Sequence, residues 1–148
     1  MKELLIVYML KPQEEGEKFD SWPLHLTLLP WFEATDEDEA VEMLGDYSSW
    51  APIEASFGGR DHFGQRGLQV RLVENTSKLQ MLHDSLLKSV EKRGWSIRGR
   101  YTGASFRPHI TERSEEVIGE RVRIDRLYLV EALGQGYRRI ISKVDLGG

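Results

Sequence analysis

The 148-residue sequence contains no cysteine and only four histidines. Without thiols the chain can form neither disulfides nor thiolate metal sites, which is compatible with a reducing compartment. Long apolar runs are also lacking, since the run from Leu4 to Leu10 covers seven residues and a membrane-spanning helix needs about 20. This run is at the short limit for a secretory signal and no small-residue cleavage site follows it. We therefore expect a cytoplasmic protein with no membrane partner.

Positive charge is scarce in the first part of the chain. The net charge is −4, and residues 1–59 hold 3 basic and 13 acidic residues, against 17 basic and 11 acidic in residues 60–148. The negative total argues against a long, non-specific nucleic-acid surface, which would need many cationic contacts to phosphates. Between positions 92 and 113 the only acid is Glu112, and the cations are Lys92, Arg93, Arg98, Arg100, Arg107 and Arg113. A short anionic substrate bound mainly by the second half fits this distribution.

Two of the histidines occur in the same local pattern, as His25-Leu26-Thr27 and His109-Ile110-Thr111. Side chains of a strand alternate between its faces, so each His would share a face with its Thr. A neutral imidazole can accept a proton, an imidazolium can donate one, and a Thr hydroxyl can donate to an oxygen of the group under attack. The repeated pattern suggests a duplicated lobe, and a site with a base, an acid and two hydroxyl donors.

The surrounding sequence predicts strands and two helices. Leu79, Leu82, Leu86 and Val90 recur on one helical face, which predicts a helix over residues 77–93, with Ser77 and Gln80 as a capping box and Gly94 as its C-terminal cap. The acidic segment that starts at Thr35 predicts a second helix. Strands are expected at 3–9, 24–31, 53–57, 68–72, 95–100, 106–113, 122–133 and 137–146, with a loop at 11–21, a turn at 58–59 and a hairpin at 134–136.

This order of elements predicts an α+β fold of two pseudo-symmetric lobes, each an antiparallel sheet backed by a helix, with a central cleft between them. Residues 1–148 are expected to form one bilobal domain that acts as a monomer. Strand parity places the apolar motif neighbours toward the helices, namely Leu24, Leu26, Leu28, Phe106 and Ile110. The cleft would be lined by His25, Thr27, His109 and Thr111.

The paired motifs resemble those of the two-histidine phosphoesterase superfamily, the 2′-5′ RNA ligase-like or LigT-like proteins. The residues that carry the resemblance are His25-Leu26-Thr27-Leu28 and Phe106-Arg107-Pro108-His109-Ile110-Thr111, with Arg113 just beyond. Glu112 departs from the pattern, because that family usually has an apolar residue there. The resemblance implies the same bilobal LigT-like fold and the hydrolysis of 2′,3′-cyclic phosphates or 2′-5′ linkages, or the formation of 2′-5′ RNA bonds by the reverse reaction.

The expected chemistry needs no metal or cofactor. A phosphodiester is cleaved when one group deprotonates the incoming nucleophile and another protonates the departing ribose oxygen. His25 and His109 can do both, because the unperturbed pKa of histidine is about 6.5, while the hydroxyls of Thr27 and Thr111 stabilise the phosphate oxygens. The sequence contains no His-x-His or His-Glu-x-x-His spacing of a metal hydrolase. RNA ends or small nucleotides are the expected substrates, and the sequence leaves open which His is the base.

Further residues are candidates for binding the substrate. Arg107 and Arg113 flank the second motif and could bind an anion, although Arg113 could pair with a neighbouring glutamate instead. Four aromatic residues could either stack on a nucleotide base or simply pack within the protein, namely Phe63, Trp31, Tyr101 and Trp22. Of the remaining histidines, His62 could approach a substrate, although a loop histidine is more often simply solvated, and we expect His83 to pack on the apolar edge of the predicted helix.

Two other functions remain open at this point. The same site could degrade cyclic di- or oligonucleotide signals, or the cleft could bind a nucleotide or RNA end without catalysis. The presence of both complete motifs favours an enzyme, because a binding module does not require two proton-transfer groups.

Overall fold

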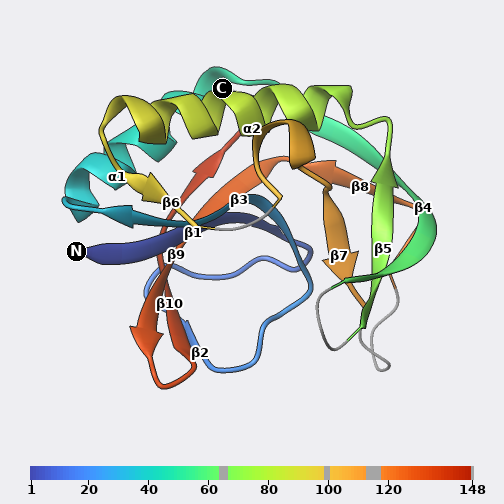
Figure 1. Cartoon of the computed structure of the whole chain (residues 1–148), viewed down its shortest axis with the longest axis horizontal. Helices are drawn as coiled ribbons and strands as arrows, with labels where there is room; N and C mark the ends of the chain where they lie inside the picture. Colours follow the sequence, from blue (N-terminus) through green and yellow to red (C-terminus); the bar gives the residue numbers. More distant parts are fainter. Residues whose placement is uncertain (64–66, 99–100, 113–117, 148) are drawn as a thin grey trace.

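The computed structural model describes residues 1–63, 67–98, 101–112 and 118–147. In these ranges a strongly curved sheet carries two α-helices, which lie together on one side of it (Figure 1). The helices are α1 (Glu37–Gly45) and α2 (Ser77–Lys92), and the 3₁₀ helices are η1 (Asp46–Ser49) and η2 (Gly103–Ser105). The predicted α+β class is confirmed.

The described strands form a single antiparallel sheet in the order β2-β10-β9-β1-β3-β7-β5-β4-β8, with β6 (Ser96–Ile97) beside β3. One half contains β1 (Lys2–Met9), β2 (Lys18–Phe19), β3 (His25–Ala34), β9 (Arg126–Gly134) and β10 (Tyr137–Asp145). The other contains β4 (Ile53–Phe63), β5 (Leu68–Glu74), β7 (His109–Thr111) and β8 (Arg121–Ile124). The two halves are joined where β3 pairs with β7, so the two sheets predicted from the sequence form one continuous sheet.

The two faces of the sheet bury different apolar clusters. The helix-side core contains Leu4 and Ile6 of β1 together with the apolar stripes of α1 and α2. The predicted inward residues Leu24, Leu26, Leu28 and Ile110 belong to this core, and Phe106 packs against it, which confirms the strand parity. The opposite face buries a smaller cluster, formed by Leu5, Val7, Met9, Tyr128, Val130 and Ile140. Strand β1 is therefore buried on both sides, which explains its nearly continuous apolar sequence.

Both predicted helices form, although their N-termini differ in detail from the predictions. Asp36, not Thr35, caps α1, because its carboxylate accepts from the backbone N–H groups of Asp38 at 2.9 Å and Glu39 at 3.3 Å. The capping box predicted for α2 is wrong. The Gln80 side chain instead donates to Asp84 and to the carbonyl of Gly103, so a local pattern was overridden by a tertiary contact.

The C-terminus of α2 follows the prediction, since Gly94 takes a positive φ of 75° directly after the helix. Within the described ranges, neither helix has the length and the hydropathy that a membrane crossing requires.

The segment predicted as one strand over 122–133 is two strands. The chain breaks at the exposed Asp125, after which β8 pairs with β4 and β9 pairs with β1. This segment therefore crosses from one half of the sheet to the other. Continuous β-propensity on both sides of Asp125 concealed the change of partner, because propensity does not report which strand is the neighbour.

Other boundaries also differ from the predictions. No turn interrupts the strand at Gly58, because β4 continues to Phe63 through an irregularity in its register with β5. A Cβ at Gly58 would overlap the Glu74 side chain, which would have to move aside. The predicted loop 11–21 contains the two-residue strand β2, and the second motif strand is short, covering only His109–Thr111.

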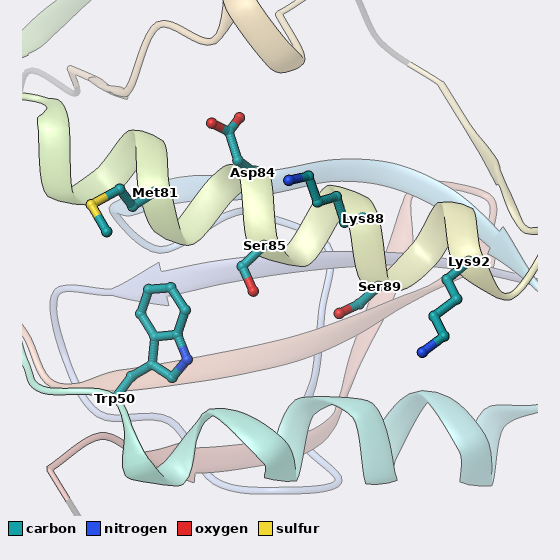
Figure 2. Close-up of a pocket in the computed structure, with 7 residues that line it drawn as sticks. All are labelled: Trp50, Met81, Asp84, Ser85, Lys88, Ser89 and Lys92. Carbon is teal, nitrogen blue, oxygen red and sulfur yellow. The ribbon is translucent and has the colours of Figure 1, made fainter.

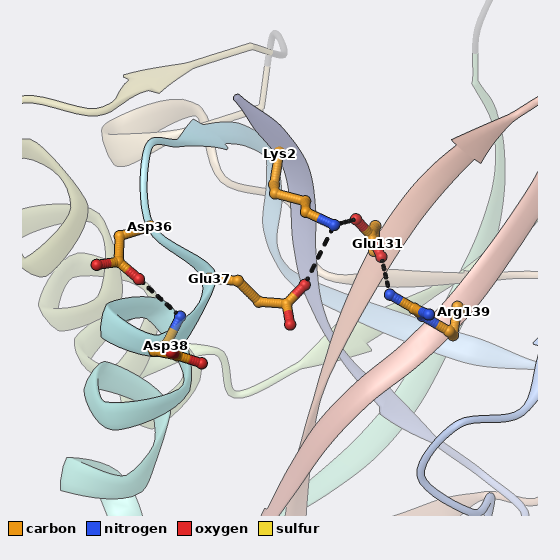
Figure 3. Close-up of polar contacts among 6 residues, drawn as sticks. All are labelled: Lys2, Asp36, Glu37, Asp38, Glu131 and Arg139. Carbon is orange, nitrogen blue, oxygen red and sulfur yellow. Dashed lines mark hydrogen bonds and ion pairs between the residues drawn. The ribbon is translucent and has the colours of Figure 1, made fainter.

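A buried carboxylate ties three strands and a helix together on the first half of the sheet (Figure 3). Glu131 is only 3% exposed and accepts from Lys2 at 2.6 Å and from Arg139 at 2.7 Å. Lys2 also lies 3.4 Å from Glu37 of α1. Burial alone would raise the pKa of Glu131, but the hydrogen bonds and charges of Lys2 and Arg139 outweigh it and lower that pKa.

We predict that Glu131→Gln lowers the free energy of unfolding by about 2 kcal/mol at neutral pH, because two charge-assisted hydrogen bonds lose their anion. The folded pKa of Glu131 lies below its unfolded value, so its contribution is complete above the unfolded pKa and disappears as the pH falls through the folded one. The difference between variant and wild type should shrink in acid. Urea unfolding from pH 7 to pH 3 measures it.

Glu54→Gln is the matched control, because Glu54 and Arg123 form a pair whose side chains are 66% and 61% exposed. This substitution should lower the free energy of unfolding by about 0.5 kcal/mol or less. Equal losses from the two substitutions would contradict a special role for the buried carboxylate.

Candidate active site

The two His-x-Thr motifs lie on adjacent strands. Leu26 of β3 pairs with Ile110 of β7, and both are fully buried beneath the helices. In an antiparallel pair, this register sets His25 opposite Thr111 and Thr27 opposite His109. All four side chains are partly exposed on the face away from the helices. Each imidazole therefore has the hydroxyl-bearing residue of the other motif as its cross-strand neighbour.

Both imidazole rings are oriented by the same local contact. The Nδ1 atom of His25 lies 2.9 Å from the carbonyl of Pro23, and that of His109 lies 2.7 Å from the carbonyl of Arg107. A carbonyl can only accept, so Nδ1 carries the proton in each ring, and Nε2 is the nitrogen whose lone pair can accept a proton. The two motifs thus share a hydrogen bond to the residue two positions earlier, a repetition that the alternating sequence pattern did not reveal.

Each motif histidine also packs against an aromatic ring that lies beneath an arginine. On the first half, His25 stacks on Trp22 at 4.2 Å between ring centroids, and the Arg138 guanidinium lies 5.3 Å from the Trp22 ring. On the second half, His109 meets Phe63 edge-on at 4.5 Å, and the Arg107 guanidinium lies 4.7 Å from the Phe63 ring.

Arg138 was not identified from the sequence. It belongs to β10, where it pairs with Phe19 of β2, and Phe19 in turn contacts Trp22. The alternation of β10 places Arg138 on the same side as Ile140, but only the tertiary structure shows that Arg138 covers the Trp22 ring that stacks on His25.

A hollow of about 400 Å³ connects the two halves at the motifs. It is lined by Trp22, Pro23, His25, Leu68, Thr111 and Glu112. Its size lies within the range of small-molecule sites, about 300 to 1,000 Å³. His25 and Thr111 line it together, as their cross-strand register requires.

The remaining predicted binding residues differ in how they are placed. Phe63 is the last residue of β4, is 8% exposed, and stacks on Tyr101 at 5.2 Å as well as contacting His109. Trp31 shares the face of the motif residues but packs against the smaller apolar cluster. Arg113 lies outside the described residues.

Arg107 lies beside the second motif but is not an isolated cation. Its guanidinium forms a 3.0 Å ion pair with Asp61, whose carboxylate also accepts from the backbone N–H of His62. The His62 and Arg107 hydrogen bonds lower the pKa of Asp61. An anionic ligand at Arg107 would therefore compete with the Asp61 carboxylate. Because a solvent-exposed ion pair is weak, breaking it would cost little free energy.

The departure at Glu112, the residue directly after β7, is accommodated by polar partners. Its carboxylate accepts from Arg60 at 2.8 Å and from Gln69 at 3.2 Å. The polar residue is thus paired, and the strand keeps its register with β5.

The environment lowers the pKa of His109. Burial is the main cause, the positive charge of Arg107 adds to it, and the hydrogen bond to the Arg107 carbonyl opposes both. The neutral form of His109 is therefore favoured at neutral pH, as a proton acceptor requires. Among the residues that the structure describes, no group of three His, Cys, Asp or Glu side chains could hold a metal ion.

A second hollow lies on the outside of the helix layer, away from both motifs (Figure 2). Trp50 and residues along α2 line it: Met81, Asp84, Ser85, Lys88, Ser89 and Lys92. The Tyr47 hydroxyl lies 2.9 Å from the Ser85 hydroxyl and 3.2 Å from that of Ser89. These contacts hold η1 against α2.

Comparison with solved structures places this arrangement in a known fold. The chain aligns over 99% of its length with 98% of protein TT0787 of Thermus thermophilus (21% identity, TM-score 0.65). It aligns with 99% of E. coli LigT complexed with 3'-AMP (15% identity, TM-score 0.64) and with 99% of a protein described as a phosphoesterase (17% identity, TM-score 0.64), in each case over 99% of this chain. No curated protein matches the sequence.

The shared fold and the paired motifs define a LigT-like protein of the two-histidine phosphoesterase class. The sequence profile of the 2'-5' RNA ligase superfamily matches residues 7–137, a range that contains both motifs. The chain therefore belongs to the 2'-5' RNA ligase superfamily.

We predict that Arg107→Gln raises the pKa of His109 toward its ordinary value, because the variant removes a nearby positive charge but retains the backbone carbonyl that orients the ring. Titration of the imidazole by NMR measures this without any substrate. Arg123→Gln, on the exposed pair with Glu54, is the control and should leave the titration unchanged. An unchanged or lower pKa in Arg107→Gln would show that the charge of Arg107 does not act on His109.

Proposed function

We propose that this protein is a metal-independent phosphodiesterase that acts on 2′,3′-cyclic phosphates or 2′-5′ linkages of RNA ends or small nucleotides, as one bilobal, monomeric domain. The observation that carries the proposal is the pairing of β3 with β7, which brings two similarly oriented imidazoles and two hydroxyls to one surface. Both proton-transfer groups and both hydroxyl donors then come from a single chain.

In the proposed reaction, Nε2 of His109 takes a proton from the attacking water or hydroxyl as its oxygen bonds to phosphorus. His25, acting in its protonated form, transfers a proton from Nε2 to the departing ribose oxygen, and the bond between that oxygen and phosphorus breaks. The hydroxyls of Thr27 and Thr111 donate to the non-bridging oxygens, where negative charge develops. The lowered pKa of His109 supports its assignment as the base.

The two arginine-covered aromatic rings favour a substrate with groups on both sides of the reacting phosphate. Arg138 above Trp22 lies on the side of His25, and Arg107 above Phe63 lies on the side of His109. E. coli LigT has been crystallised with 3'-AMP, ATP and NADP+, which supports a nucleotide-sized ligand in this fold. A 2′-5′-linked or cyclic dinucleotide would engage both arginines, whereas a 2′,3′-cyclic mononucleotide would engage one.

The test is product analysis with EDTA present, using 2′,3′-cyclic mononucleotides, 2′-5′ and 3′-5′ dinucleotides, and cyclic dinucleotides. We expect cleavage of at least one substrate by the wild type. His25→Ala and His109→Ala should each reduce turnover by about 100-fold or more, the usual scale for losing a positioned proton-transfer group.

His62→Ala is the matched control, because His62 is exposed on β4 and should be dispensable. Nucleotide binding without any turnover would replace the enzyme by a binding module. Undiminished turnover in either motif variant would refute the assignment of that histidine.

A separate prediction concerns the hydroxyl donors. Thr111→Val keeps the shape of the side chain but removes the hydroxyl beside His25, so kcat should fall by about 10- to 100-fold with a smaller change in KM. Thr111→Ser retains a hydroxyl and should recover most of the loss. Equal activities of the Val and Ser variants would mean that Thr111 acts by packing alone.

A further inference from the structure

We propose that His83 of helix α2 is a positioning residue, which holds the two motif strands in their relative arrangement by bridging the backbone after Thr27 to the segment that leads into His109. The expected effect of His83 on turnover rests on the proposed phosphodiesterase function, whereas its expected effect on the geometry of the strands is independent of that function.

His83 is a fully buried polar side chain on the apolar face of α2. Its Nδ1 atom lies 2.8 Å from the carbonyl of Leu28, and its Nε2 atom lies 2.8 Å from the backbone N–H of Gly103. A carbonyl only accepts and an N–H only donates, so Nδ1 carries the proton and Nε2 does not. The two contacts therefore select one neutral tautomer, and both ring nitrogens are used. The predicted packing role of His83 is accordingly incomplete.

The first contact falls at a bulge beside the first motif. Ile6 and Val7 are consecutive in β1, but their partners in β3 are Leu29 and Thr27, so Leu28 is an extra residue. A bulge leaves backbone groups without ladder partners and re-aims the neighbouring side chains. The His83 ring supplies the missing donor for the Leu28 carbonyl, immediately after Thr27. It thereby supports the local geometry on which the direction of the Thr27 hydroxyl depends.

The second contact controls the entry to the other motif. Helix α2 holds Gly103 at both backbone groups, since His83 accepts from its N–H and the Gln80 side chain donates to its carbonyl at 2.8 Å. Gly103 has a positive φ of 58°, which suits glycine at this turn. The chain then reaches Phe106, whose ring stacks on His83 at 4.0 Å with an interplanar angle of 3°.

The residues after Phe106 carry the site. The Arg107 carbonyl orients the His109 ring, and the Arg107 guanidinium covers Phe63. Strand β7 is held on one side by β5, but it pairs with β3 at a single position, so the ladder between the two motif strands is short. The buried His83 ring contacts β3 at Leu28 and the segment before β7 at Gly103 and Phe106, and it thereby compensates for this short pairing. Displacement of about 1 Å between reacting groups can reduce a rate about 100-fold.

The decisive variant is His83→Phe, which keeps an aromatic ring to stack on Phe106 but removes both hydrogen bonds. We expect kcat to fall by about 10-fold or more per folded molecule, with KM nearly unchanged, because the reacting groups lose alignment while the binding surface persists. His83→Asn can still donate to Leu28 and His83→Gln can still accept from Gly103. Each should lie between the wild type and His83→Phe.

Tyr47→Phe is the matched control. It also removes two hydrogen bonds from a buried ring to α2, at Ser85 and Ser89, but neither bond reaches a motif strand. Its kcat per folded molecule should stay near the wild-type value even if its stability falls. Wild-type kcat in His83→Phe, or an equal loss in Tyr47→Phe, would overturn the proposal.

A substrate-free measurement separates this proposal from the proposed function. In backbone NMR spectra, His83→Phe should shift the amide signals of Thr27 and Thr111 on both motif strands, whereas Tyr47→Phe should leave them in place. If the wild type cleaves nothing in the substrate panel, the proposed function fails while these shifts still decide the role of His83. Amide shifts confined to α2 and Gly103 would contradict the proposed positioning role of His83.

Discussion

The pairing of Leu26 with Ile110 is the interaction on which the rest of the site depends. Both side chains are buried under the helix layer, and burial of apolar surface of this kind is the main favourable term in folding. Because residues opposite each other in an antiparallel pair share a face, this core contact also exposes the two motifs together on the other face. The hydrophobic core and the alignment of the polar site are thus two consequences of one strand register.

The histidines are alike in their local geometry and different in their surroundings. Each ring is oriented by a carbonyl two residues earlier and packs on an aromatic ring with an arginine above it. Burial and the positive charge of Arg107 lower the pKa of His109. This favours the neutral form of His109, which is the form that a general base requires.

Helix α2 contributes more than an apolar cover to the sheet. Gln80 and His83, one turn apart, both form hydrogen bonds with the backbone of Gly103, and His83 also binds the carbonyl of Leu28 at the bulge. Buried polar side chains persist in a core when all their hydrogen-bonding groups are satisfied, and such contacts favour one arrangement over its alternatives. The buried Glu131 joins β1, β9 and β10 in a comparable way on the first half.

The amino-acid sequence by itself determined the α+β class, the helix over residues 77–93, the inward face of each motif strand and the identity of the two motifs. These follow from periodicity, which depends only on the local geometry of helices and strands. The tertiary structure decided that β8 and β9 belong to different halves, that Gln80 binds Gly103 and not its own helix N-terminus, and that Arg138 covers the Trp22 ring beside His25. Each of these depends on which distant segment becomes the neighbour, and the choice of neighbour is made by the packing of the whole core and not by local sequence.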